Sequence, residues 1–327
     1  MADTMKAAVI YDAGGPEVLK LENRPVPNPA AGELLIKVMA FGLNRSELFT
    51  RQGHSPKSAV GFPRILGIEA VGVVASSSGE FLEGDIVATA MGGMGRAFDG
   101  SYAEYTCVPA SQVQKLQTHL PWETLGAIPE MLQTAWGSLF TALRLEKSDA
   151  LLIRGGTTSV GLAAAAIAKN FGATVAATTR KPEREKLLRD NGADHVFVDT
   201  GDIALQVREI FPNGVDKILE LVGTTTLLDS LQCARRNGAV CMTGMVGNQW
   251  TLKDFSPMGA IPTSVNLTSY SGGAEDFNQT PLQDLVSQIE AGTLKPQIGK
   301  VFALDEIVEA HACMEANQAN GKIVILP

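Results

Sequence analysis

A run of small residues between an apolar segment and an alanine-rich segment is the part of this sequence best suited to chemistry. After LLIR at 151–154 the chain reads GGTTSVGLAAAAIAKNFG. Small side chains leave backbone N–H groups accessible, and the start of a helix adds partial positive charge, so such a loop can bind a pyrophosphate. The residues we expect to contact the anion are Gly156, Thr157, Thr158, Ser159, Val160 and Gly161.

The spacing of these glycines matches the dinucleotide fingerprint GxGxxG only in part. Gly156 and Gly161 hold two of its positions, but Thr158 stands where another glycine is expected. The motif is informative when it follows a strand and begins a helix. Because the flanking sequence meets both conditions, we favour a dinucleotide site over a glycine-rich turn that only packs a helix on a strand.

The end of the next apolar segment, TVAAT at 174–178, indicates which dinucleotide is bound. A carboxylate at that point would hold the ribose 2′-hydroxyl of NAD. Here the chain continues with Thr179, Arg180 and Lys181, and no acid occurs before Glu183. A hydroxyl and two cations suit the 2′-phosphate of NADPH through charge-assisted hydrogen bonds. The sequence therefore predicts NADPH, the alternative being a solvated start of the following helix.

Residues that could bind a metal are few and scattered. The cysteines and histidines are Cys107, Cys233, Cys241, Cys313, His54, His119, His195 and His311. None of them forms a pair with zinc-ligand spacing, so we expect no metal site, and we expect no disulfide framework. We also expect a reducing cytoplasmic setting.

Two sequence patterns, one in each part of the chain, predict the elements that position these residues. From Lys6 to about Leu116, short strand-like runs are broken by Gly and Pro, which predicts a β-rich, barrel-like domain. After about Leu120, strand-like runs alternate with helical segments, which predicts an α/β domain with a doubly wound parallel sheet. Its six strand-like runs are LLIR, TVAAT, HVFVD, KILELV, AVCMTG and SVNLTSY.

The predicted domain boundaries follow from these two sequence patterns and from the chain length. A chain of 327 residues is too long for one ordinary core. We assign residues 1–118 to the first domain, completed by about 300–327, and residues 119–299 to the dinucleotide-binding domain. The net charge of −8 argues against nucleic acid or an anionic membrane surface as the main partner.

Five segments resemble the medium-chain dehydrogenase/reductases, and most closely their zinc-free quinone oxidoreductase (zeta-crystallin-like) branch. The resemblance implies a GroES-like catalytic domain followed by a Rossmann domain. Zinc enzymes of the family carry a cysteine and a histidine where this chain has Asn44 and Ile68, and neither replacement is a competent zinc ligand. The segments are KAAVIYDAGGPEVLKLE, VMAFGLNRSELFTRQG, FPRILGIEAVGVV, LLIRGGTTSVGLAA and GKIVILP.

The resemblance also implies further site residues. Asn44 is expected to position nicotinamide and substrate, the alternative being a turn residue after Gly42, and Thr134 to contact the nicotinamide end. His54 is a candidate proton donor or an idle loop residue. Other expected cofactor positions are Val222, Gly223, Gly244, Met245, Val246, Tyr270, Ser271, Gly272, Asn320, Gly321 and Lys322.

Three neighbouring residues are expected to have structural roles. Trp136 replaces a tyrosine common in relatives, and we expect it to pack in the helical core rather than to alter the site. Glu69 is expected to belong to the barrel, and Arg45 to form an ion pair with Glu47 or another nearby acid.

These observations predict an NADPH-dependent, zinc-independent oxidoreductase that transfers a hydride to a quinone or an activated alkene (enone). Without a Lewis acid, an acceptor must itself delocalise the negative charge. The alternatives are an enoyl-thioester reductase and a non-enzymatic NADPH-binding protein of the zeta-crystallin type. Loops around residues 44–64, 91–100 and 245–262 are expected to line the substrate pocket. The resemblance also implies a homodimer that pairs edge strands of the Rossmann sheets around SVNLTSY.

Overall fold

The computed structural model describes residues 4–55 and 59–327, and these form two compact units. The first unit contains residues 1–130, 272–290 and 296–327, and the second contains 131–271 and 291–295. Part of the segment 44–64, expected to line the substrate pocket, lies outside the described residues at 56–58.

The first unit is built from two β-sheets. A small antiparallel sheet has the order β2-β1-β4, and a larger sheet has the order β15-β16-β3-β5-β6-β8, with β7 also paired to β3. The last strand, β16, runs antiparallel to β3 and parallel to β15. The strands are β1 (Thr4–Ile10), β2 (Lys20–Pro25), β3 (Glu33–Gly42), β4 (Arg64–Ile65), β5 (Glu69–Ser76), β6 (Ile86–Ala90), β7 (Tyr105–Pro109), β8 (Val113–Lys115), β15 (Ile298–Ala303) and β16 (Lys322–Leu326).

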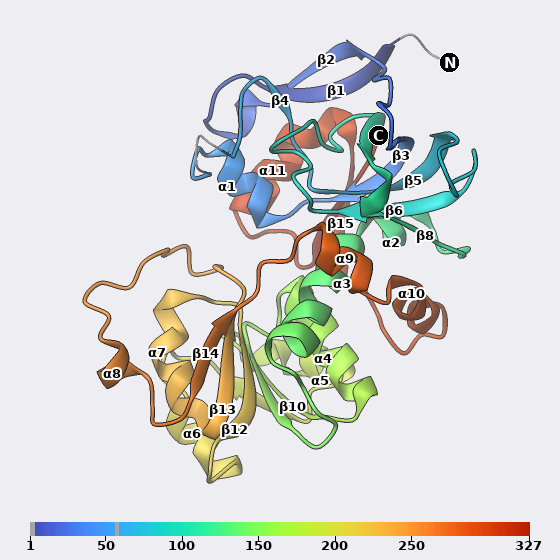
Figure 1. The fold of residues 1–327 in the computed structure, drawn as a ribbon. Coiled ribbons are helices and arrows are strands. Elements are labelled where there is room, and N and C mark those ends of the chain that lie inside the picture. Colours follow the sequence, from blue (N-terminus) through green and yellow to red (C-terminus); the bar gives the residue numbers. More distant parts are fainter. Residues whose placement is uncertain (1–3, 56–58) are drawn as a thin grey trace. The chain divides into compact units, whose positions relative to one another are not determined.

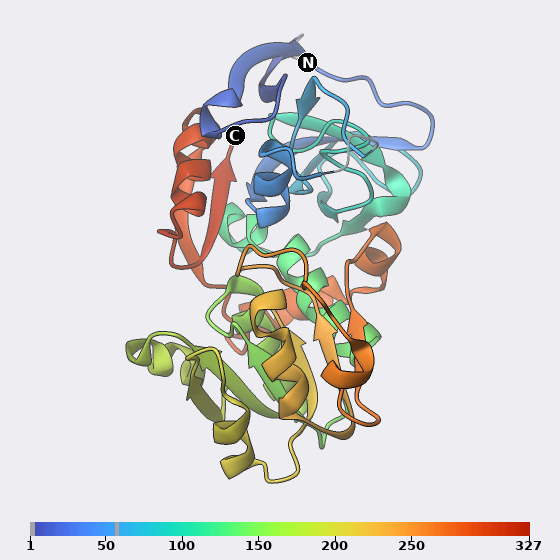
Figure 2. The same cartoon turned by 90° about the vertical axis from the view of Figure 1, so that its left-hand side faces the viewer.

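Short helices cover this unit, and one of them closes its core. Helix α11 places Ile307 and Ala310 in the same buried cluster as Leu34 and Ile36 of β3, and Figure 2 shows α11 beside β16. Burial of these apolar faces stabilises the unit by roughly 25 cal/mol per Å². The helices are α1 (Arg45–Arg51), α2 (Trp122–Gly126), α9 (Ala274–Gln279), α10 (Leu282–Glu290), α11 (Ile307–Glu315) and the 3₁₀ segments η1 (Pro16–Val18), η2 (Ala110–Gln112) and η5 (Leu304–Glu306).

The second unit is the predicted doubly wound parallel sheet. Its order is β11-β10-β9-β12-β13-β14, and every neighbouring pair is parallel. Figure 1 shows α4 (Ser159–Phe171) and α5 (Glu185–Asp190) on one side of the sheet and α6 (Ala204–Ile210) and α7 (Thr224–Cys233) on the other. The strands are β9 (Ala150–Arg154), β10 (Thr174–Thr179), β11 (His195–Val198), β12 (Val215–Glu220), β13 (Ala234–Met242) and β14 (Asn266–Ser269).

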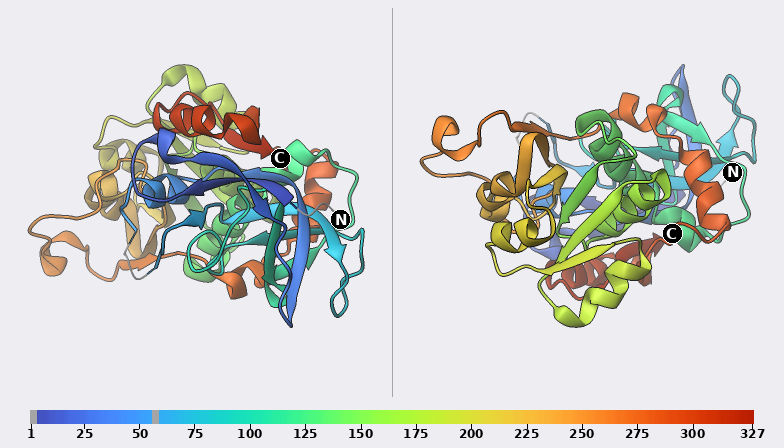
Figure 3. Two further views of the ribbon diagram at one scale, coloured as in Figure 1. Left: turned by 90° about the horizontal axis from the view of Figure 1, so that it is seen from above. Right: turned by 90° about the horizontal axis from the view of Figure 1, so that it is seen from below.

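Helix α3 begins in the first unit and continues into the second, while the other helices named here lie entirely in the second. The segment that carries α8 projects away from the sheet in both views of Figure 3. The elements are α3 (Pro129–Trp136), the π-helical turn η3 (Gly137–Ala142), α4 (Ser159–Phe171), η4 (Pro182–Arg184), α5 (Glu185–Asp190), α6 (Ala204–Ile210), α7 (Thr224–Cys233) and α8 (Pro257–Ala260).

Sequence explains why the central strand is buried on both faces. Leu151, Leu152 and Ile153 of β9 are fully inaccessible to solvent, as expected for a parallel strand covered by helices on each side. The run Ala163–Ala166 lets α4 approach β9 and β10 closely because alanine adds only a methyl group.

The units differ from the sequence-based boundaries at three segments. Residues 119–130, 272–290 and 296–299 belong to the first unit, whereas we placed them in the second. Hydrogen bonds account for part of the difference: Gln114 donates to the carbonyl of Thr280 at 3.1 Å, and Gln117 and Gln283 bond reciprocally at 2.8 and 3.0 Å. These side-chain contacts join segments far apart in sequence, so strand periodicity does not reveal them.

Two further properties concern helices and cysteines. Among the helices of residues 4–55 and 59–327, none has both the length and the apolar character needed to cross a bilayer. All four cysteines are free thiols.

Candidate functional site

The glycine-rich loop joins β9 to α4 through a tight turn. Gly155 has φ +85°, a left-handed value that favours glycine. Thr158 is the N-cap of α4: its Oγ1 accepts from the Gly161 amide at 3.0 Å and donates to the Gly155 carbonyl at 2.9 Å. The threonine in place of a glycine therefore stabilises the turn from within.

Gly156 and Gly161 allow this turn to pack tightly. A Cβ at Gly156 would lie 2.9 Å from the Cβ of Ala177, and one at Gly161 would lie 2.7 Å from the Gly155 carbonyl oxygen. Both distances are shorter than a normal contact, so larger residues would push the helix away from the loop. The two fingerprint glycines that remain are those that the backbone geometry demands.

The residues expected at the 2′-phosphate lie at the end of β10. Thr179 is buried, and its Oγ1 accepts from the Lys181 amide at 3.1 Å, which fixes the turn. Arg180 and Lys181 are exposed, and no carboxylate of the described residues pairs with either one. Two exposed cations without acidic partners are suited to bind a phosphate dianion.

Sequence analysis missed Arg154, the last residue of β9, which organises this edge of the sheet. Its guanidinium is fully buried and bonds both oxygens of Asp199 at 2.8 Å, while also contacting Asp229 of α7. Burial alone would raise the pKa of Asp199, but the bonds to Arg154 outweigh it and hold that pKa below its ordinary value. An arginine inside an apolar strand, directly before a glycine loop, was the available signal.

Glu220 fixes the turn after β12 in a similar way. One oxygen accepts from the amides of Val222 at 2.7 Å and Gly223 at 3.0 Å, and the other accepts from the Ser230 hydroxyl. Burial raises the pKa of Glu220 above its ordinary value. The amides of Gly244 and Val246 then donate to the carbonyls of Glu220 and Leu221. The structure thereby brings together the predicted positions Val222, Gly244, Met245 and Val246.

Tyr270 and Thr134 lie in one region of the second unit. The Tyr270 hydroxyl donates to the carbonyl of Gln133, the residue before Thr134, at 3.5 Å. A Cβ at Gly137 would fall 2.0 Å from the Tyr270 ring, so this glycine makes room for the aromatic side chain. Ser271, which follows, is exposed.

Trp136 packs within the helices of the second unit. The centroid of its ring lies 4.1 Å from that of the Phe140 ring. The Phe140 ring in turn meets Phe171 of α4 edge-on, with 5.0 Å between the ring centroids. Trp136 therefore packs on a helical neighbour, as expected, but it is half-buried rather than part of the core.

Asn44 lies in a buried polar cluster of the first unit, formed with Glu47, Glu69, Glu130 and Lys322. Its amide nitrogen donates to Glu69 at 2.9 Å, and its oxygen accepts from the ammonium of Lys322. Glu69 also accepts from the backbone amide of Glu130 at 2.8 Å. Glu69, the first residue of β5, therefore makes structural contacts in the first unit, while its exclusion from the chemistry stays a prediction.

Lys322, which we expected near the cofactor, places its ammonium in this cluster. The nitrogen lies 2.8 Å from Glu69 and 3.7 Å from Glu130, and the side chain is only 3% exposed. Burial disfavours the ammonium, but the attraction of Glu69 and Glu130 outweighs it, so the pKa of Lys322 is raised. Its hydrogen bonds are thus made within the protein.

Glu47 closes the cluster from the side of α1. Its carboxyl accepts from the backbone amides of Asn44 at 3.1 Å and Ile68 at 3.2 Å. Burial, together with the nearby charge of Glu69, raises the pKa of Glu47 to about 8. A carboxyl with that pKa is mostly protonated at neutral pH.

Other residues predicted near this site are more peripheral. The His54 imidazole is exposed and meets Phe49 edge-on at 6.3 Å. Arg45 was expected to pair with an acid but instead donates to the amide oxygen of Asn317, because the Glu47 carboxyl is engaged by the backbone. Asn320 is exposed, with φ +56°.

The donor groups of the described residues do not form a metal-binding cluster. No group of three His, Cys, Asp or Glu residues in 4–55 and 59–327 is arranged to hold an ion. Of the two positions aligned above with zinc ligands, Asn44 bonds Glu69 and Lys322, and the apolar side chain of Ile68 is buried.

Comparison with known proteins identifies the family. Residues 30–118 match the model of the alcohol dehydrogenase GroES-like domain, which confirms that part of the predicted fold, and residues 191–325 match that of a zinc-binding dehydrogenase. The chain is 30% identical to a human quinone oxidoreductase over 329 residues, covering 98% of each protein.

Two further proteins are similar over nearly their full length. A 2-haloacrylate reductase from a Burkholderia species is 28% identical, with 98% of each protein covered. A mycobacterial protein whose structure is described as complexed with NADPH has a TM-score of 0.87 and 28% identity, covering 99% of this chain and all of the other. The chain belongs to the medium-chain dehydrogenase/reductase superfamily, in its quinone oxidoreductase branch.

Proposed function

We propose that this protein is an NADPH-dependent oxidoreductase that reduces a quinone or an activated alkene without zinc. The observation that carries the proposal is the pair of exposed cations Arg180 and Lys181, which follow β10 and have no acidic partner among the described residues. Together with the glycine-rich loop after β9, they supply the two anion sites that NADPH needs.

Different residues of the second unit suit different parts of the cofactor. The amides of 156–161 suit the pyrophosphate, since Gly156 and Gly161 leave the backbone uncovered. Thr179, Arg180 and Lys181 suit the 2′-phosphate. NADPH, when bound, supplies the hydride. The relative with a described NADPH complex supports this choice of cofactor.

The residue types at the predicted reaction centre limit the class of acceptor. An amide and an isoleucine, Asn44 and Ile68, stand where zinc enzymes of the family hold ligands, so we assign no Lewis acid to the reaction. Quinones and alkenes conjugated to a carbonyl delocalise the charge that hydride addition creates. The names of two relatives, quinone oxidoreductase and 2-haloacrylate reductase, support these classes.

A substrate panel tests the proposal. NADPH oxidation is measured with 1,4-benzoquinone, a simple enone and crotonyl-CoA, each repeated with NADH. The proposal expects turnover of the quinone or enone with a preference for NADPH. Turnover of crotonyl-CoA alone would make the protein an enoyl-thioester reductase, and tight NADPH binding without turnover would make it a cofactor-binding protein of the zeta-crystallin type.

We propose in addition that the protein is a homodimer through β14. This strand ends the six-stranded order, and an end strand offers unpaired backbone groups to a second copy. Light scattering after gel filtration should give twice the monomer mass. Replacing Leu267 of β14 by proline should yield monomers, and a monomeric wild type would refute the assembly.

A further inference from the structure

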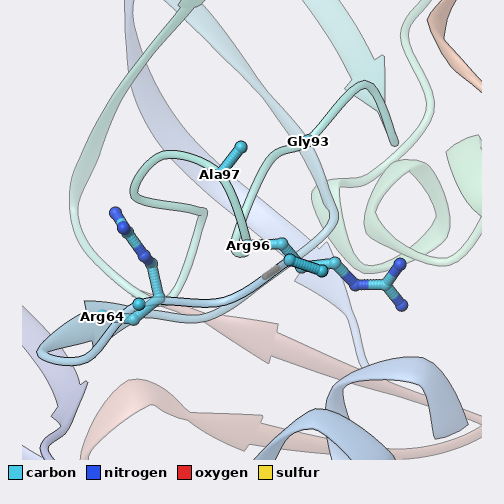
Figure 4. A pocket seen from close by; sticks show the side chains of 6 residues that line it. Arg64, Gly93, Arg96 and Ala97 are labelled. Carbon is cyan, nitrogen blue, oxygen red and sulfur yellow. The ribbon is translucent and has the colours of Figure 1, made fainter. Parts of the chain in front are cut away.

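The first unit contains a pocket of about 490 Å³ that the proposed cofactor site does not use. This volume lies within the range of small-molecule sites. Arg64 and Arg96 are among its lining residues, and Figure 4 shows that their side chains leave the chain in different directions. The other lining residues are Ala59, Gly61, Gly93 and Ala97.

The two arginines differ in how their charge is balanced. Arg64 forms an ion pair with Asp99 at 2.9 Å. Arg96 donates to the hydroxyl of Ser46, and no carboxylate of the described residues lies within ion-pair distance of it. The Nε atom of Arg96, like that of Arg64, is also buried without a hydrogen-bond partner among these residues. A partly buried guanidinium that lacks a carboxylate partner favours the binding of an anion.

The position of Arg96 connects the pocket with the predicted reaction centre. Its partner Ser46 lies in the first turn of α1, two residues after the N-cap Asn44. Arg96 and the residues 59–64 also belong to two of the segments expected to line the substrate pocket. An anion on Arg96 would therefore lie beside the first turn of α1, the helix that Asn44 caps.

We propose that Arg96 binds a carboxylate carried by the substrate, so that the preferred acceptors are conjugated alkenes with an acid group. The remaining lining side chains are small and uncharged, which leaves room for a short carbon chain. Arg96 is the residue that selects the acid, since Arg64 is already paired. This inference rests on the proposed reductase function.

The test compares an acid with its neutral ester. Wild-type kcat/KM is measured with NADPH for trans-4-oxo-2-pentenoate and for its methyl ester, and we expect the acid to be preferred by at least about tenfold, the worth of one charge-assisted contact. In Arg96→Gln the preference should fall to about one, and Arg96→Lys should restore part of it because it keeps the charge. Arg24→Gln removes an exposed arginine of the same unit and should keep the preference.

Titration calorimetry with the saturated acid 4-oxopentanoate gives a readout without turnover. We expect binding to the wild type and to Arg24→Gln, and binding at least about tenfold weaker to Arg96→Gln. Turnover of the ester without any preference for the acid would overturn this inference and leave the proposed function standing. Arg96-dependent binding without turnover would overturn the proposed function and keep the anion site. Stronger Arg96-dependent binding of coenzyme A would assign the arginine to a phosphate and overturn the carboxylate.

Discussion

The ammonium of Lys322 lies 2.8 Å from the carboxylate of Glu69, and both side chains are buried. This ion pair connects the last strand of the chain, β16, to β5 and, through a shared contact, to Asn44 at the start of α1. The position of the predicted reaction centre thus depends on the carboxy-terminal strand. The consequences predicted for this ion pair can be measured without knowing the substrate.

Lys322→Met should destabilise the protein strongly. The substitution leaves Glu69 and Glu130 without their cation, and breaking a buried ion pair in this way costs about 3–5 kcal/mol. Adding Glu69→Gln to this variant should recover much of the lost stability, because the carboxylate of Glu130 is then no longer buried beside that of Glu69. Urea denaturation of the wild type and the two variants measures the free energy of unfolding. Equal stability of wild type and Lys322→Met would contradict the assigned contacts.

Glu47 should make stability depend on pH between about 4.5 and 8. Its pKa rises from 4.5 to about 8 on folding, so the folded state binds this proton more tightly than the unfolded state. The stabilisation is therefore fully present below pH 4.5 and is lost as pH rises through 8. Glu47→Gln, which cannot ionise, should flatten the decline of the unfolding free energy between pH 5 and 8. An unchanged slope would show that Glu47 is already ionised in the folded protein.

The sequence was sufficient to predict the elements whose patterns are local. The strand runs 151–154 and 174–178, with the glycine-rich loop between them, correspond to β9, β10 and the N-terminus of α4. The acidic partners of Arg154 and Lys322 could not be predicted from such local patterns. The partners of Arg154 are Asp199, directly after β11, and Asp229 of α7, while Glu69, a partner of Lys322, lies more than a hundred residues away. Periodicity says nothing about such pairings, and a lone buried cation has no local signal that identifies its acid.

Arg180→Ala and Lys181→Ala together should weaken NADPH binding by roughly a hundredfold or more, because each removes a charge-assisted contact to the 2′-phosphate, worth about 1.5–3 kcal/mol. NADH, which lacks that phosphate, should bind nearly as before. Titration calorimetry with both cofactors measures the difference, and Lys186→Ala, on the exposed side of α5, serves as the control. Tight binding of NADH by the wild type, equal to that of NADPH, would refute the role of these cations.

His54→Phe should retain quinone reduction to within about tenfold, which corresponds to about 1.4 kcal/mol in the barrier. The imidazole is exposed, and the product of quinone reduction can take its proton from water. Asn44→Ala should lower kcat/KM more, roughly 10- to 1,000-fold, because it removes the amide that bridges Glu69 and Lys322 at the predicted reaction centre. An inactive His54→Phe beside an active Asn44→Ala would reverse this ranking.

Transfer of deuterium from NADPH to an enone, by protein shown by elemental analysis to contain no zinc, tests the central claim most directly. NADPH that carries deuterium at both C4 positions is incubated with the protein and a simple enone, and mass spectrometry locates the label in the saturated product. The account predicts one deuterium on the β-carbon, with a yield that chelators do not change. A product without deuterium, or transfer that appears only after zinc is added, would contradict it.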